Sequence, residues 1–130
     1  IYLHNIKKYI NIIDIIDMII LEKIKTILFF ILKQEYLYYI VKNNKTFLND
    51  EEIVEFTNNL LEIKEKTIIE DIFNKLEEKC SIEIYNKDVD KEDILEMMEE
   101  VLEDRELIIN RMILEVKSHQ KSKMSLNVTI

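Results

Sequence analysis

Polar positions in the first part of the chain form a narrow stripe at helical spacing. Between residues 4 and 25 the stripe comprises His4, Lys7, Asn11, Asp14, Glu22 and Lys25, with isoleucine or leucine in most other places. A period near 3.6 with so little polar surface predicts a helix that is buried on most sides. Residues 26–41 either continue this helix or form a second one, and residues 42–46 (KNNKT) are the first clear interruption.

Helix starts are indicated at three places by a capping residue that stands three positions before an acid. These pairs are Asn49 and Glu52, Thr67 and Glu70, and Asp90 and Asp93. Each resembles a capping box, in which the two side chains satisfy the free N–H groups of a first helical turn. Arg105 interrupts the apolar face of the last helix, and Asp104 can serve as a new N-cap, so we expect a break at residues 103–105.

Two short segments instead alternate apolar and polar residues, which is typical of extended chain. The first is residues 81–85, and the second is residues 124–130. We therefore predict an all-α protein with one domain, residues 1–130, of five to six helices and a short β-bridge. It comprises a very apolar helical segment at 1–33, amphipathic helices at 34–118 and a polar tail at 119–130 with a strand-like end. A plain antiparallel helical bundle is the alternative.

Apolar residues also recur in corresponding places around three possible loops. With Leu48, Ile84 and Met124 at the loop centres, the preceding positions are Leu37 and Ile40, Phe73 and Leu76, and Ile113 and Val116, and the following ones are Ile53, Val89 and Thr129. Eleven of these twelve positions are apolar, and the loops recur after 36 and 40 residues. In this respect residues 33–130 resemble the EF-hand scaffold of the calmodulin superfamily. The resemblance implies helix-loop-helix units whose loops pair as a short β-bridge.

The calcium ligands of that family are missing from these loops. A working loop needs oxygen ligands at positions one, three and five, a Gly at six and a Glu at twelve. The first loop keeps only Glu52 at position twelve, and the third is basic, with Lys117 and Lys121 at ligand positions. A separate frame that starts at Asp88 supplies acids but has Asp93 where Gly is required. We therefore expect a degenerate scaffold that binds no calcium, other metal or cofactor.

Composition narrows the possible functions further. The chain has no Gly, so phosphate-cradling loops and nucleophile elbows are unlikely. Its single cysteine, Cys80, excludes an internal disulfide framework and favours a reducing intracellular compartment. A net charge of −8 argues against nucleic acid as a partner. No catalytic pair stands out among the 26 acids, so we predict that the protein is not an enzyme.

Charge and hydropathy are unevenly distributed. Residues 1–48 contain seven lysines and four acids, whereas residues 49–130 contain eleven basic residues and 22 acids. Acidity concentrates between Asp88 and Glu106. Residues 10–32 are very apolar, but five charged residues interrupt them, so we expect no transmembrane span. The abundance of Ile, Asn, Lys and Glu is typical of AT-rich genomes, such as those of many parasites.

These observations predict a non-enzymatic interaction or regulatory domain that binds an apolar or amphipathic helix of a partner. The apolar candidates for the contact are Phe29, Phe30, Met97, Met98, Val101 and Met112. The acidic candidates, which would face a basic partner, are Glu96, Glu99, Glu100 and Glu103. Two alternatives are a structural bundle that homo-oligomerises through its apolar N-terminal segment and a helical parasite or viral effector.

Overall fold

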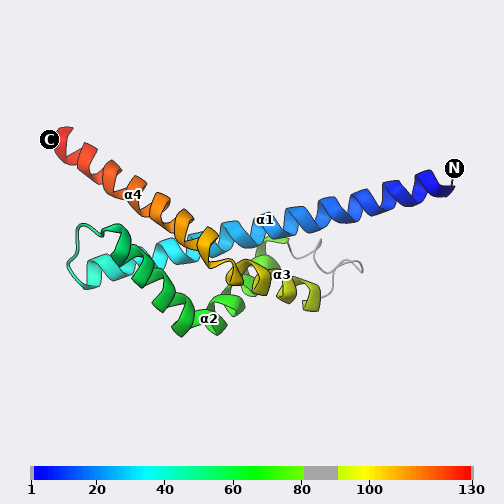
Figure 1. Ribbon diagram of the computed structural model, residues 1–130, viewed down its shortest axis with the longest axis horizontal. Coiled ribbons are helices and arrows are strands. Elements are labelled where there is room, and N and C mark those ends of the chain that lie inside the picture. The colour runs from blue at the N-terminus through cyan, green and yellow to red at the C-terminus, as the bar shows by residue number, and fades with distance from the viewer. Residues whose placement is uncertain (1, 81–90, 130) are drawn as a thin grey trace.

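The computed structural model describes residues 2–80 and 91–129, with side chains described for 18–76, 78 and 91–123. Within these residues the chain forms four helices and no strand. They are α1 (Tyr2–Lys42), α2 (Asp50–Cys80), α3 (Lys91–Glu103) and α4 (Arg105–Thr129). Figure 1 shows that α2, α3 and α4 gather beside the C-terminal part of α1, while its N-terminal part extends beyond them. The predicted all-α class is confirmed.

Four helices replace the expected five or six because two predicted boundaries are absent. Residues 26–41 continue α1 without interruption. In α2 the helix bends at Lys64 (φ −111°, ψ 17°) and continues through Thr67, so no new helix begins there. The bend keeps Leu61 and Ile68 in the core, at 0% and 2% exposure. Burial of both apolar faces therefore outweighs the local capping signal.

The strand-like end expected for residues 124–130 is wrong for residues 124–129, which belong to α4. No Gly or Pro separates these residues from the preceding helix, so a short alternation does not stop it. The third expected loop, residues 117–128, is consequently helical. The first coincides with the connection between α1 and α2, and the segment with Ile82 and Ile84 lies outside the described residues.

The end of α1 is closed by a left-handed residue, although the chain has no Gly. Asn44 has a φ of 51°. Its N–H donates to the carbonyl of Val41 (3.3 Å), and the N–H of Lys45 donates to the carbonyl of Ile40 (2.9 Å). This pair of bonds is a Schellman motif, with Asn in the position that Gly usually takes. The Asn43 side chain adds a bond from Nδ2 to the carbonyl of Tyr39 (2.9 Å).

Two predicted helix starts are confirmed by their capping bonds. The N–H of Glu52 donates to Oδ1 of Asn49 (2.9 Å), and the N–H of Asn49 donates to Oε1 of Glu52 (3.3 Å). This is the reciprocal arrangement of a capping box. Asp104 separates α3 from α4, and its Oδ1 accepts from the N–H of Leu107 (3.3 Å). The predicted break at residues 103–105 is therefore an N-cap.

All four helices contribute to one hydrophobic core. From α1 and the loop after it come Ile20, Ile24, Ile27, Leu28, Phe29, Ile31, Leu32, Tyr36, Ile40 and Leu48. From the other helices come Ile53, Leu60, Leu61, Ile68, Ile72, Leu76, Ile94, Met98, Val101, Leu102, Ile108, Met112 and Val116. The C-terminal half of the apolar segment 10–32 is thus buried inside the domain.

Candidate interaction surface

Four of the six apolar residues expected to contact a partner lie in the core instead. Phe29, Met98, Val101 and Met112 are between 0% and 8% exposed. The sequence could not separate the two roles, because a core stripe and a binding stripe have the same helical spacing. They hold the helices of this chain together and offer no surface to another protein.

Phe30 and Met97, the remaining apolar candidates, lie closer to the surface. Phe30 is 51% exposed, and the Nζ atom of Lys75 lies 4.3 Å from its ring centroid. This geometry is a cation–π contact within the chain. Met97 is half-buried against the core. These two residues therefore complete the packing of the bundle at its edge and form no apolar patch of their own.

The four acidic candidates are exposed side by side on α3. Glu99 and Glu100 each lie three or four residues from both Glu96 and Glu103, so the four share one face of the helix. Among the described side chains none of them takes part in an ion pair. The structure thus separates the acidic candidates from the buried apolar ones, and the sequence had grouped the two sets into one surface.

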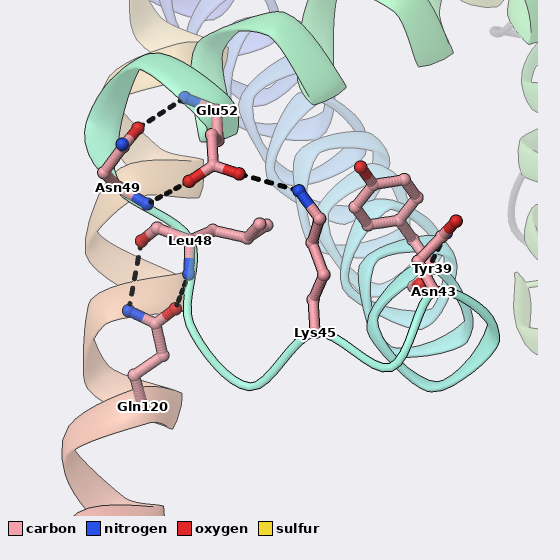
Figure 2. A network of polar contacts seen from close by, with 7 residues as sticks. All are labelled: Tyr39, Asn43, Lys45, Leu48, Asn49, Glu52 and Gln120. Carbon is pink, nitrogen blue, oxygen red and sulfur yellow. Dashed lines mark hydrogen bonds and ion pairs between the residues drawn. The ribbon is translucent and has the colours of Figure 1, made fainter.

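A polar contact that the sequence did not indicate fixes the loop after α1 to α4. Figure 2 shows Gln120 beside the backbone of Leu48: the Leu48 N–H donates to Oε1 (2.8 Å), and Nε2 donates to the Leu48 carbonyl (3.4 Å). Both residues are buried, so these bonds satisfy backbone groups that water does not reach. An ion pair between Lys117 of α4 and Asp50 (3.1 Å), the first residue of α2, lies beside this contact at the surface.

The same network continues along the loop through Lys45. Its Nζ atom donates to Oε2 of Glu52 (2.8 Å), as Figure 2 shows. This hydrogen bond and the opposite charge raise the pKa of Lys45. They also lower the pKa of Glu52, together with the bond from the Asn49 N–H. One carboxylate therefore caps α2 and holds the loop at the same time.

A groove between the end of α1 and α2 lies beside this network. Its apolar lining comes from Tyr39, Phe56, Leu60 and Ile63, and its volume is about 470 Å³. The Tyr39 and Phe56 rings contact each other with centroids 5.0 Å apart. Ile63 stands 81% exposed at its edge. An apolar groove between two helices is the kind of site that the sequence predicted for a partner helix. None of the residues predicted to contact the partner lines this groove.

His119 occupies a half-buried place between α4 and α1. Its ring contacts that of Tyr36 edge to face, with centroids 5.9 Å apart. The Nε2 atom is buried and has no hydrogen-bond partner in the described part of the chain. Burial lowers the pKa of His119, and the charges of Lys123 and Lys33 lower it further. The imidazole is thus held in its neutral form by its surroundings.

A further apolar pattern is found in the sequence of the extended part of α1. Isoleucines and tyrosines recur there alternately four and three residues apart, at Tyr2, Ile6, Tyr9, Ile13 and Ile16. We call these five positions the α1 seam. The next residue at the same spacing, Ile20, is buried in the bundle at 5% exposure. Figure 1 shows that the backbone of α1 continues beyond α2, α3 and α4, and the sequence spacing places the five seam positions in line with Ile20.

At the base of this extension the first described side chains are already exposed. Met18 is 65% exposed and Ile19 is 49% exposed. An alternation of four and three residues is the spacing by which two helices pack against each other in coiled coils. That alternation is visible in the sequence, and its significance follows from the arrangement of the four helices.

The described residues include no group of three or more His, Cys, Asp or Glu side chains placed to hold a metal ion. None of the helices, over the residues described, is both long enough and apolar enough to span a membrane. Comparison of the chain with protein-family models, curated proteins and solved structures finds no match. The EF-hand resemblance therefore stays a prediction, and function is argued from the surface of the molecule alone.

Proposed function

We propose that this chain is a non-enzymatic interaction protein that binds an apolar or amphipathic helix along the N-terminal part of α1. The observation that carries the proposal is that the backbone of α1 extends beyond the other helices of the bundle (Figure 1), where the sequence places the α1 seam. An apolar stripe on an unaccompanied helix leaves hydrocarbon in contact with water. Packing against a second helix removes this contact and is favourable for that reason.

The spacing of the α1 seam supports a helix as the binding partner. Residues four and three apart form knobs that insert between side chains of a facing helix. The positions beside the seam include Leu3, Ile10 and Ile12, which widen the apolar face. An extended strand or a flat surface offers no holes at this repeat. A partner helix with the same apolar spacing matches it along the full length of the extension.

A short helix on its own is only marginally stable in water, which gives the proposal a second support. Residues 2–17 form about four turns, and isolated helices of this length depend on packing for their stability. Within the bundle, the C-terminal part of α1 receives that packing from α2, α3 and α4. For the extension a partner helix would supply it.

The proposal is tested with a designed helix of about 21 residues, fluorescently labelled, that has Leu and Ile at alternating spacings of four and three. Fluorescence anisotropy should show saturable binding to the full chain. A double variant, Ile6→Asp and Ile13→Asp, should lose the binding because it places charges in the seam. The matched control is Asn11→Asp, which adds a charge outside the seam and should bind as the unmodified chain does. Equal binding by the double variant and the control would contradict the proposal.

A further inference from the structure

We infer that the C-terminal part of α4, residues 117–129, is an acid-sensitive latch, which protonation of His119 opens while the bundle up to Val116 stays folded. This property goes beyond the proposed function and does not depend on the α1 seam. Two features of the described residues support it. The contacts of this segment are confined to one helical turn, and the imidazole of His119 lies where a positive charge is unfavourable.

The polar and ring contacts that hold the latch all lie within one helical turn, over the side chains that the structure describes. Each joins a residue of α4 to α1, to the loop after it or to the start of α2: Lys117 to Asp50 (3.1 Å), His119 to Tyr36 and Gln120 to Leu48. Residues 121–123 are exposed, and Figure 1 shows that the last turns of α4 lead away from α2. The described part of the latch is therefore anchored at its first turn.

The apolar core contributed by α4 ends before the latch begins. Within its described side chains the buried apolar residues are Ile108, Met112 and Val116. Opening the latch moves none of them, so it exposes little of the core. Local openings of this kind require much less free energy than unfolding of the whole domain. A change at His119 can therefore act on the latch while the bundle stays folded.

The surroundings of the His119 imidazole disfavour a charged ring. Its Nε2 atom is buried and has no hydrogen-bond partner in the described part of the chain. Lys33 of α1 and Lys123 of α4 bring positive charge toward it. Tyr36 stays neutral, because burial raises the pKa of its hydroxyl. Protonation therefore places a cation beside two others and leaves its buried N–H without an acceptor.

Two acids of this region are already paired with other cations. Glu115 lies one turn before the ring, and its carboxylate oxygens lie 4.0 Å from Nζ of Lys33 and 3.5 Å from Nε of Arg111. On the α2 side, Asp50 is paired with Lys117. Neither carboxylate is free to stabilise an imidazolium in the closed latch.

Opening the latch removes this conflict and changes the surface of the protein. The ring reaches water, which solvates its charge, and water also satisfies the Leu48 N–H and carbonyl that Gln120 leaves. Leu48 is 2% exposed in the closed form and lines the same hollow as Phe47, which is 63% exposed. Acid therefore adds apolar surface at the loop after α1.

Hydrogen exchange at the Leu48 amide reports on the latch, because this buried N–H donates to Gln120 and exchanges only when that bond opens. At pH 5.5, an imidazole that opening returns to its ordinary pKa of 6.5 is about ten times more often charged than neutral. From pH 7.5 to 5.5 the protection factor of Leu48 should therefore fall several-fold, and by at most about 10-fold.

The measurement uses nuclear magnetic resonance on the full chain, with each exchange rate divided by the intrinsic rate at the same pH. The amides of Ile108 and Met112 exchange when the bundle unfolds. They should be at least about 10-fold more protected than the Leu48 amide at both pH values, since a local opening needs less free energy.

Substitution of the histidine separates the latch from other titrating groups. His119→Phe keeps an aromatic ring against Tyr36 but cannot be protonated, so the pH dependence of Leu48 protection should disappear. His119→Gln should have the same effect, and His4→Phe is the matched control that should retain the dependence. A dependence that persists in both His119 variants, or an unchanged protection factor in the unmodified chain, would overturn the latch. Leu48 and Met112 amides of equal protection would overturn it too, because the contact would then open only with the whole bundle.

Discussion

At the residue scale, this chain shows how a protein without Gly meets a requirement that Gly usually meets. The Schellman motif at the end of α1 needs a left-handed residue, and Asn44 supplies it at a φ of 51°. Asn tolerates this conformation better than other residues with a Cβ atom because its short polar side chain can hydrogen-bond locally. The absence of Gly therefore does not exclude tight helix ends.

The protonation of His119 provides a prediction at the same scale. Its pKa is lowered from 6.5 in the folded chain, so the unfolded chain takes up the proton more readily. The free energy of unfolding should therefore fall as the pH falls through 6.5 toward the folded pKa. The groups around the ring are Tyr36 and Lys33 of α1 and Lys123 of α4, with Glu115 paired to Lys33 at 4.0 Å.

Urea unfolding between pH 7.5 and 5.5 measures this dependence. His119→Gln cannot take up a proton and should show a weaker pH dependence than the unmodified chain. His4 is present in both proteins, so the difference between their slopes belongs to His119. Identical slopes would show that the ring is protonated as easily in the folded chain as in the unfolded one.

At the scale of helices and loops, local signals predicted some boundaries and failed at others. Asn49, Glu52 and Asp104 predicted real caps because capping depends on residues within one turn. Thr67 carried a similar signal inside α2, where Ile68 continues a buried face and the helix bends without ending. Gln120 gave no signal, since its contact with Leu48 spans 72 residues of sequence. Long-range contacts of this kind are not encoded in any local pattern.

The contact of Gln120 with Leu48 predicts how firmly the loop is held to α4. Gln120→Leu keeps a side chain of similar volume but leaves the Leu48 N–H and carbonyl buried without hydrogen-bond partners. An unsatisfied buried backbone group costs about 1–3 kcal/mol, so the free energy of unfolding should fall by about 2–6 kcal/mol for the two groups. Urea denaturation followed by circular dichroism measures the change.

Lys117→Leu is a matched control in the same helix. It removes an exposed ion pair with Asp50, and exposed pairs contribute about 0–1 kcal/mol. If the two variants lost equal stability, the backbone contact of Gln120 would not be what holds the loop. Hydrogen exchange at the Leu48 amide should rise in Gln120→Leu and stay slow in Lys117→Leu.

At the scale of the whole molecule, the apolar segment 10–32 is divided between two environments. The sequence predicted that it is buried within the domain or against a partner, and the structure places Ile20 to Leu32 in the core. The sequence alone could not locate the boundary, near Met18, between the buried part of α1 and its extension. That boundary depends on where α2, α3 and α4 end along α1. For the same reason Met98 and Met112 were predicted on a surface although they lie inside the bundle.

This division predicts that two deletions only eight residues apart have different effects. A chain of residues 18–130 keeps every described core residue and should unfold cooperatively, with a free energy of unfolding close to that of the full chain. A chain of residues 26–130 also lacks Ile20 and Ile24, which are 5% and 0% exposed. Burial of an isoleucine side chain contributes about 1.5–3 kcal/mol, so this chain should lose about 3–6 kcal/mol. That is a large part of the stability of a typical domain. Urea denaturation at low micromolar concentration compares the two chains. If the 18–130 chain also lost cooperative unfolding, the extension would be part of the folded body, and the α1 seam would not be available to a partner helix.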